Sequence, residues 1–312
     1  MRIRAIPLKE HSVSRPEPDD QASGLRRLLG DRPAFQPLGL IGPDDDLNAS
    51  ATAGLACALS QRGSRTCVID ELPAPGTVAT RLGLTPRHSL DAAALGRHWL
   101  EDALIGLPEG PGLLRAERPM AGIAESDDQH WNRLGEEFSD AAWTWLLLAA
   151  PSDDRPSLAL AAPWRLLVLP AAKSRLAEAY AVAKAAHRRQ PDARWLALFM
   201  NAPDTARAES LMTALDETAR RFLGLDIAYL GVIPKDDALD LATRAMQPLH
   251  QVAPSAPATL AFRQLADRLP TDPVDRRLDA RSFWQRLGLF ARHNRLPRYP
   301  EPKHVQHGRV FG

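Results

Sequence analysis

The sequence is poor in cysteine, in long apolar runs and in net charge. Two cysteines, Cys57 and Cys67, occur among 312 residues, which argues against a disulfide scaffold and predicts buried thiols in a reducing compartment, the cytoplasm. The longest apolar stretches, at 143–150 and 158–172, are bounded or broken by proline or arginine. Neither a membrane-spanning helix nor a signal peptide is therefore expected. A formal net charge of +1 argues against direct nucleic-acid binding by bulk electrostatics.

The sequence shows no set of metal ligands and no basic patch of the kind that binds nucleic acid. The histidines are scattered, and His304 and His307 stand alone in the polar end of the sequence, so no metal site is predicted. The pairs Arg188–Arg189 and Arg220–Arg221 end helical patterns. They are better interpreted as solvated helix ends.

Three zones follow one another along the chain. Residues 1–36 form a polar, proline-bearing arm with one short helical pattern, residues 37–270 alternate apolar runs with helical patterns, and residues 271–312 carry an amphipathic helix and a polar end. The apolar runs are PLGLIG, RTCVID, GLLRA, WTWLLLA, RLLVLP, RWLALFM and DIAYLGVI. This alternation predicts an α/β fold, with a doubly wound, mostly parallel sheet and helices on both faces.

Two of the helical patterns have an apolar stripe that we expect to cover the sheet. In the segment 174–189 the stripe comprises Leu176, Tyr180 and Ala183. In the segment 205–224 the stripe comprises Leu211, Leu215, Ala219 and Phe222. Apolar residues at this spacing fall on one side of an α-helix.

The stretch LIGPDDDLNASATAGLACALS begins with the first predicted strand, continues through a tight turn and ends in a helix. Such a turn is the natural anion site of an α/β sheet, because backbone N–H groups and the helix dipole point there. A phosphate loop adds glycines, a lysine and a hydroxyl. Here Gly42 is followed by Pro43 and by three aspartates, Asp44, Asp45 and Asp46. One carboxylate about 4 Å from a phosphate opposes it by roughly 1 kcal/mol in water and about 4 kcal/mol at an effective dielectric of 20.

The aspartates allow two interpretations. In the first, Asp46 or Asn48 caps a helix that starts near Ala49, and the other carboxylates are solvated in the turn. In the second, the carboxylates bind a cation, but adjacent side chains on a turn diverge and no partner ligands are identifiable elsewhere. The first interpretation is favoured.

Five segments, taken in order, give the chain a resemblance to a known family. They are DQASGLRRLL, RLGLTPRHSLDAAALG, SRLAEAYAVAKAAHRR, FLGLDIAYLGVIPKDDAL and SAPATLAFRQLADRL. Together, from about Asp20 to Leu269, they resemble the MinD/ParA-like P-loop ATPases, and within these the flagellar-number regulators called FlhG, FleN or YlxH. The resemblance implies the P-loop NTPase fold.

The resemblance also implies that the phosphate loop is degenerate. The family motif GKGGVGKT falls on Gly42 to Ala49, so its two lysines map to Pro43 and Asn48 and its threonine maps to Ala49. The lysines that bind the phosphates and the threonine that places the metal ion would therefore be missing. ATP and Mg²⁺ are therefore not expected as cofactors, unless the chain is an active ATPase with unusual phosphate chemistry.

Two further family carboxylates are affected. The DAD motif after the second strand maps to Asp70 and the two residues that follow it, so Leu72 replaces the second aspartate, and the Walker B aspartate falls about Ala149. Leu72 and Ala149 have no group that can activate water or hold Mg²⁺. Asp70 alone remains, and a carboxylate at a strand end is as easily a cap or a turn residue as a relic of catalysis. The resemblance thus implies a pseudo-ATPase and no catalytic residues.

The N-terminal motif implies a partner. In FlhG this motif docks on the signal-recognition-particle-type GTPase FlhF and stimulates its hydrolysis. The matching residues here are Asp20, Gln21, Ala22, Leu25 and Arg26. An amide such as Gln21 can orient an attacking water, and Leu25 can anchor a helix in a groove. Without the resemblance the segment would be read as a capped surface helix.

The segment 281–295 leaves two interpretations about even. Apolar residues lie near one face with arginines around them, which is the composition of an interfacial membrane helix and equally of a helix docked on its own domain. The apolar residues are Phe283, Trp284, Leu287 and Phe290.

The sequence therefore favours a non-hydrolysing regulator of flagellar biogenesis, number or placement that acts through protein contacts, first of all with FlhF. Flagellar switch or transcription-regulator proteins are further possible partners, and the family raises the expectation of peripheral contact at the inner membrane face or the cell pole. Two alternatives remain: an active MinD/ParA-type ATPase and an adaptor unrelated to flagella.

Overall fold

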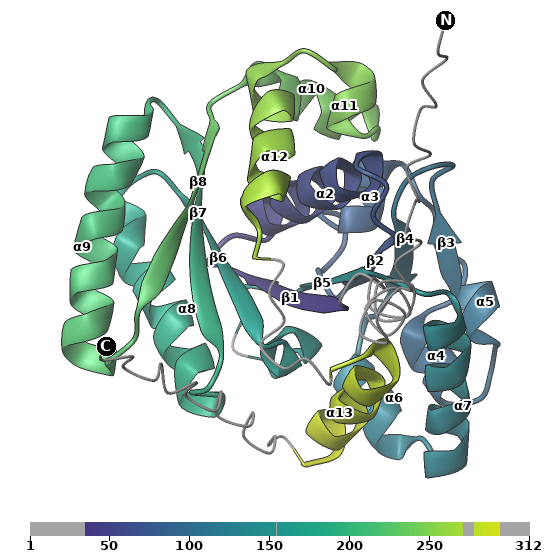
Figure 1. Ribbon diagram of the computed structural model, residues 1–312. Coiled ribbons are helices and arrows are strands. Elements are labelled where there is room, and N and C mark those ends of the chain that lie inside the picture. The colour runs from purple at the N-terminus through teal and green to yellow at the C-terminus, as the bar shows by residue number, and fades with distance from the viewer. Residues whose placement is uncertain (1–34, 154, 271–277, 294–312) are drawn as a thin grey trace, which may run out of the picture. The chain divides into compact units, whose positions relative to one another are not determined.

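A single eight-stranded sheet organises the part of the chain that the computed structural model describes, which is residues 35–153, 155–270 and 278–293. The strands are β1 (Gln36–Ile41), β2 (Thr66–Asp70), β3 (Leu104–Gly106), β4 (Gly112–Arg115), β5 (Trp145–Ala149), β6 (Trp164–Pro170), β7 (Arg194–Ala202) and β8 (Ile227–Pro234). Their order is β3-β4-β2-β5-β1-β6-β7-β8 (Figure 1). Neighbouring strands are parallel except for the antiparallel pair of β3 and β4.

Helices cover both faces of this sheet, as the strand and helix alternation predicts. One face carries α2 (Asp45–Gln61), α3 (Val78–Leu82), α10 (Asp237–Ala245), α11 (Leu249–Val252) and α12 (Pro257–Arg268). The other carries α4 (Leu90–Ala94), α5 (Leu100–Ala103), α6 (Pro119–Glu125), α7 (Asp128–Asp140), α8 (Leu176–Arg189), α9 (Thr205–Leu223) and α13 (Ala280–His293), with the 3-10 turns η1 (Leu158–Ala161) and η2 (Lys173–Arg175). The predicted fold class is confirmed.

Each central strand is buried on both sides. In β5, Leu146 and Leu148 face one apolar core, and Leu147 and Ala149 face the other, because successive side chains of a strand point to opposite faces. Every one of the seven apolar runs forms a strand, so this prediction is confirmed. Strand β3 was not predicted, since its three residues are partly exposed and have no apolar alternation.

The prediction of which residues of the two helices cover the sheet is largely correct, with one error at the end of α9. Leu211 and Leu215 are buried, but Phe222 is 65% exposed. The helix ends at Gly224, whose φ of 62° turns the chain back. Leu225 then donates its N–H to Ala219 O at 3.3 Å and is buried in place of Phe222.

The two cysteines are buried free thiols, as expected. Cys57 lies in α2 and Cys67 in β2. Burial raises the pKa of the Cys57 thiol to about 12 and raises the pKa of Cys67 further, so both thiols are unreactive at neutral pH. None of the described helices combines the length and the apolar character that a membrane-spanning segment requires.

Candidate functional site

The turn after β1 is shorter than a phosphate loop, because helix α2 begins within it. The N-cap is Asp44, with extended φ and ψ of −146° and 113°, and its Oδ1 accepts a hydrogen bond from Leu47 N at 3.0 Å. Asn48 N is already bonded to Asp44 O at 3.0 Å. The prediction of a helix start near Ala49 with Asp46 or Asn48 as the cap is therefore wrong. The earlier aspartate accepts a free N–H group of the first helical turn, that of Leu47, and the helix starts about one turn earlier.

Asp44 also faces a cation from the opposite side of the sheet. Its Oδ2 lies 3.9 Å from Nη2 of Arg175, and the same Nη2 donates to Pro43 O at 3.3 Å. Arg175 is shared, because its Nε pairs with Glu178 at 3.0 Å. The guanidinium thus ties the turn to the start of α8.

The other two aspartates have partners of their own, which corrects the expectation that they are merely solvated. Asp45 Oδ1 accepts the backbone N–H of Ser152 at 2.6 Å. Asp46 Oδ1 accepts Nη2 of Arg81 at 2.7 Å. Because consecutive side chains diverge, the three carboxylates bind different segments and do not converge on a common cation. In the described part of the chain no group of three or more His, Cys, Asp or Glu side chains could hold a metal ion.

Gly42 and Asn48 are used for packing. A Cβ at Gly42 would collide with Val168 O and lie 2.7 Å from Asn48 Oδ1, so glycine is required where β1 leaves β6. Asn48 is fully buried, and its Nδ2 donates to Ala150 O at 3.3 Å. Its Oδ1 has no hydrogen-bond partner among the described residues. Asn48 Oδ1 is a hydrogen-bond acceptor, as is a phosphate oxygen, so the two cannot hydrogen-bond to each other.

Asp70 at the end of β2 fastens the following loop. It is fully buried, its Oδ1 accepts Leu72 N at 3.2 Å, and its Oδ2 accepts Ala79 N at 3.0 Å, in the first turn of α3. Burial raises the pKa of this carboxyl, while the hydrogen bonds and the nearby Arg115 lower it. Asp70 could have been a cap, a turn residue or a relic of catalysis. The contacts observed are those of a cap, because its carboxylate accepts backbone N–H groups of the loop and of α3.

Glu71 is the ionisable residue that the sequence did not single out. It is 6% exposed, and its Oε1 accepts Ser157 Oγ at 2.8 Å and Leu158 N at 3.0 Å, where η1 begins. Burial raises its pKa to about 8, and the charge of Asp91 contributes in the same direction. The carboxyl is therefore mostly protonated at neutral pH. No local sequence pattern predicts this buried, protonated carboxyl, because its partner Ser157 lies 86 positions away in the sequence.

Helix α13 is docked on its own domain. Its Phe283, Trp284, Leu287 and Phe290 are all fully buried and pack with α6, α7 and η1. Of the two interpretations left open for this helix, docking is therefore correct and membrane contact through these side chains is not. Apolar groups already buried in a core are not available to lipid. The segment 271–312 thus contributes a helix to the core of the α/β domain.

The N-terminal docking motif, with Asp20, Gln21, Ala22, Leu25 and Arg26, lies outside the described residues.

Comparison with known proteins shows what this chain is similar to. No protein-family model matches the chain. The chain is 27% identical over 230 residues to "Antiactivator FleN" of Pseudomonas aeruginosa, which spans 72% of the chain and 82% of FleN. The MinD cell division ATPase of Pyrococcus furiosus has the same fold, with a TM-score of 0.58 and 19% identity over 75% of the chain and 98% of MinD. The chain is thus similar to FleN in sequence and shares the fold of the MinD and ParA ATPases, which supports an FlhG/MinD-like P-loop family.

A second solved structure with this fold, the MinC:MinD cell division protein complex of Aquifex aeolicus, gives a TM-score of 0.59. The sequence identity is 19%, and the match covers 77% of this chain and 97% of the solved chain. Both structural likenesses concern the fold.

The residues at the P-loop position do not fit Mg-ATP. The turn holds three carboxylates and no lysine, and two N–H groups in the first turn of α2, those of Leu47 and Asn48, already have Asp44 as their partner. Leu72 and Ala149, at the ends of β2 and β5, are fully buried and apolar. The two guanidinium groups near the turn, those of Arg81 and Arg175, are engaged by its aspartates. An FlhG/MinD-like fold is thus retained around a position with the wrong charge and donors for a triphosphate.

Proposed function

We propose that this chain is a non-hydrolysing, FleN-like regulator of flagellar biogenesis, number or placement that works through protein contacts. The likeness to Antiactivator FleN over most of both chains supports a regulatory role. The Aquifex MinD, found in a complex with MinC, supports protein contact as the way a chain of this fold acts. The observation that carries the loss of ATP chemistry is the turn in which Asp44, Asp45 and Asp46 each bind a segment of this chain.

Two of these contacts, those of Asp44 and Asp46, oppose ATP in different ways. Asp44 occupies the N–H group of Leu47, which a phosphate would need. Asp46 pairs with Arg81 at 2.7 Å, so this cation already has an anionic partner. A triphosphate entering the turn would have to break these contacts and remain beside the freed carboxylates. The repulsion of even one carboxylate, about 4 kcal/mol at an effective dielectric of 20, exceeds the roughly 0.3–1 kcal/mol that a helix dipole offers.

Calorimetric titration of the full chain with Mg-ATP and Mg-ADP tests the loss of nucleotide. We expect no saturable heat, while a MinD with an intact phosphate loop, titrated in parallel, binds. Micromolar, saturable binding by this chain would remove the pseudo-ATPase part of the proposal.

The proposed partner is a GTPase of the FlhF type, which would be engaged through the N-terminal residues Asp20, Gln21, Ala22, Leu25 and Arg26. The full chain should raise GTP hydrolysis by FlhF, and Gln21→Ala and Leu25→Ala should each reduce that stimulation. Ser23→Ala, within the same segment but outside the matched positions, is the control and should keep it. An intact chain that leaves the rate of GTP hydrolysis unchanged would refute this partner, whatever the nucleotide titration shows.

A further inference from the structure

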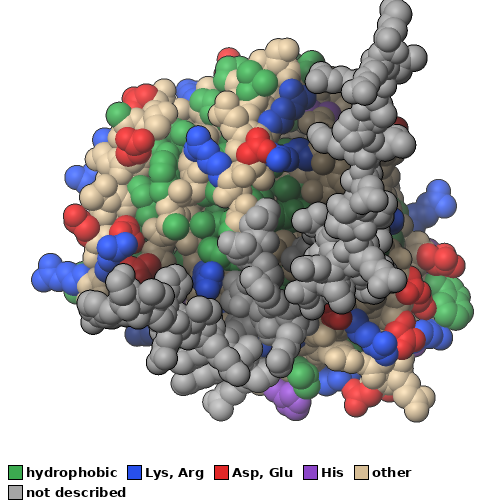
Figure 2. Space-filling model, in the orientation of Figure 1, with side chains coloured by type: hydrophobic (Ala, Val, Ile, Leu, Met, Phe, Trp, Pro, Cys, Tyr) green, Lys and Arg blue, Asp and Glu red, His purple; other side chains and the backbone are tan. Residues whose placement is uncertain are grey.

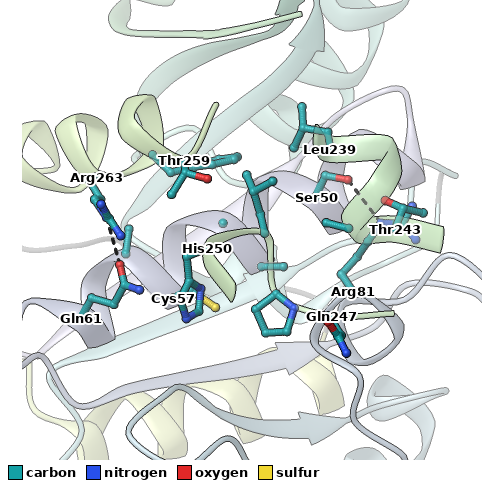
Figure 3. Close-up of a pocket in the computed structure, with 17 residues that line it drawn as sticks. Ser50, Cys57, Gln61, Arg81, Leu239, Thr243, Gln247, His250, Thr259 and Arg263 are labelled. Carbon is teal, nitrogen blue, oxygen red and sulfur yellow. Dashed lines mark hydrogen bonds between the residues drawn. The ribbon is translucent and has the colours of Figure 1, made fainter. Parts of the chain in front are cut away.

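Two hollows in the described part of the chain differ in how much they can hold. The first lies between α2 and α12, where Arg263 hydrogen-bonds Gln61 (Figure 3), and its volume of about 40 Å³ has room for a few water molecules. The second lies between α5, the end of α7 and the strands β3 and β4, and its volume is about 360 Å³. Pockets that hold small molecules measure roughly 300–1,000 Å³, so the second hollow has room for a ligand and the first does not.

The walls of the second hollow are apolar and include three aromatic rings, those of Trp99, Phe138 and Trp143, which give it the name tryptophan pocket. Leucine side chains of α5, β3 and β4 complete the apolar lining. The rings of Phe138 and Trp143 are tilted with their centroids 6.2 Å apart. Trp99 is 52% exposed, so a flat ligand has an apolar surface to cover at the opening.

The charge of the tryptophan pocket is negative. Glu101, Glu137 and Asp140 line it, and among the described residues no Lys or Arg does. Glu137 is engaged, because its Oε1 lies 3.6 Å from Arg133 Nε and its Oε2 accepts Leu100 N at 3.2 Å. Figure 2 shows a protruding hydrophobic side chain between Asp and Glu side chains at the right-hand edge of the view, beside α5 and α7.

The other two carboxylates, those of Glu101 and Asp140, are exposed and form no ion pair with any described residue. Asp140 is the last residue of α7, where the partial negative charge of the helix end adds to its own. The side of the pocket that these two residues form therefore attracts a cation.

The two indoles of the pocket already contact cations. The guanidinium carbon of Arg133 lies 4.4 Å from the centre of the Trp99 ring, and that of Arg65 lies 5.8 Å from the centre of the Trp143 ring. Both distances fall within the roughly 6 Å over which an aromatic face attracts a cation. Neither arginine lines the pocket. Even when both are counted, the three lining carboxylates exceed the two guanidinium groups, so a negative charge is left for a ligand.

We propose that the tryptophan pocket binds a small organic cation with a flat apolar body, such as an aromatic amidine or amine. The body lies against the aromatic rings, and the cationic group pairs with the carboxylates of Glu101 and Asp140. Neither the flagellar role nor the partner proposed above is needed for this site, so the two proposals can fail separately.

Titration of the full chain with benzamidine, followed by calorimetry, tests the site. Benzamidine has a flat ring and carries a positive charge at neutral pH, and we expect one molecule to bind saturably to each chain. Benzamide, with the same ring and no charge, should bind at least about tenfold more weakly, and benzoate should not compete. Equal binding of benzamide, competition by benzoate, or no saturable binding of benzamidine up to about 1 mM would overturn the proposal.

Variants locate the site. The double change Glu101→Gln and Asp140→Asn should weaken benzamidine binding about tenfold, since it removes both unpaired carboxylates. Glu217→Gln removes a negative charge from an exposed position of α9, far along the chain and outside the pocket, and this control should bind as the natural chain does. Binding that the double change does not weaken, or that Glu217→Gln weakens equally, would refute the assignment to this pocket.

The indole N–H signals in nuclear magnetic resonance spectra give a readout that does not depend on the carboxylate variants. The chain has seven tryptophans, and the signal of Trp99 is the one that Trp99→Leu removes. That signal should shift saturably as benzamidine is added to the natural chain. Trp99→Leu should bind benzamidine at least about threefold more weakly, because it removes one aromatic face. A Trp99 signal that stays in place at saturating benzamidine would overturn the proposal.

Discussion

Trp131 on α7 and Trp284 on α13 exchange hydrogen bonds. Each indole Nε1 donates to the main-chain carbonyl of the other residue at 3.1 Å, and the two rings stack with their centroids 4.6 Å apart. Gly135 and Gly288 make room for the rings, because a Cβ at Gly135 would lie 2.7 Å from Trp284 Cδ1, and one at Gly288 would collide with Trp131 Nε1. This reciprocal contact explains why α13 belongs to the core.

Truncation of this pair should destabilise the domain strongly. Trp284→Ala removes a fully buried ring and leaves Trp131 Nε1 packed against a cavity, so we expect a loss of about 3–5 kcal/mol in the free energy of unfolding. Urea denaturation measures it. Leu289→Ala, on the same helix but 45% exposed, is the control and should cost below about 1 kcal/mol. A loss of that small size for Trp284→Ala would show that α13 is not docked as described.

Glu71 should make the free energy of unfolding fall as the pH rises from acid toward alkaline values. Its folded-state pKa of about 8 lies above the ordinary glutamate pKa of 4.5, so the stability it contributes is complete below about pH 4.5 and is lost as pH rises through about 8. The natural chain should therefore lose up to a few kcal/mol between pH 5 and pH 8.5 from this group. Urea midpoints across that range should fall less steeply for Glu71→Gln, which stays neutral. Parallel profiles for the two chains would contradict a raised pKa.

The cap on α2 should be measurable by itself. Asp44→Ala removes the acceptor for Leu47 N and should cost about 1 kcal/mol, whereas Asp44→Ser retains a capping oxygen and should cost less. Thermal unfolding compares the two variants. Equal losses would show that the hydrogen bond does not stabilise the start of the helix.

A buried guanidinium ties the end of α8 to the sheet. Arg165 is fully buried, with Nη1 donating to Ala186 O and Gln190 O at 3.2 and 3.0 Å and Nη2 donating to Leu160 O at 2.7 Å. Arg165→Met leaves these carbonyls without that donor, and we expect it to cost about 3 kcal/mol or more in the free energy of unfolding.

Chemical denaturation of Arg165→Met beside Arg207→Met, which changes an exposed arginine of α9, separates this contact from the general effect of losing a positive charge. Similar midpoints for the two variants would refute the role assigned to Arg165.

Much of the fold could be predicted from short-range pattern. Runs such as RTCVID and RLLVLP have continuous apolar centres, CVI and LLVL, because parallel strands are buried on both faces, and their alternation with helices implies the doubly wound sheet. The edge strand β3 and the exposure of Phe222 could not be predicted in this way. The first is too short for a periodic signal, and the second depends on how the chain turns at Gly224.

At the candidate site the sequence by itself determined the charge, three aspartates with no lysine in the turn, and hence the misfit with a phosphate. Only the tertiary structure decided what the carboxylates do, because the partners of Asp45 and Asp46 lie 107 and 35 positions away in the chain. The same holds for α13. Its apolar face was evident from helical spacing, but hydropathy does not distinguish lipid from protein, and the choice required the complementary surface that Trp131 and Gly135 of α7 provide.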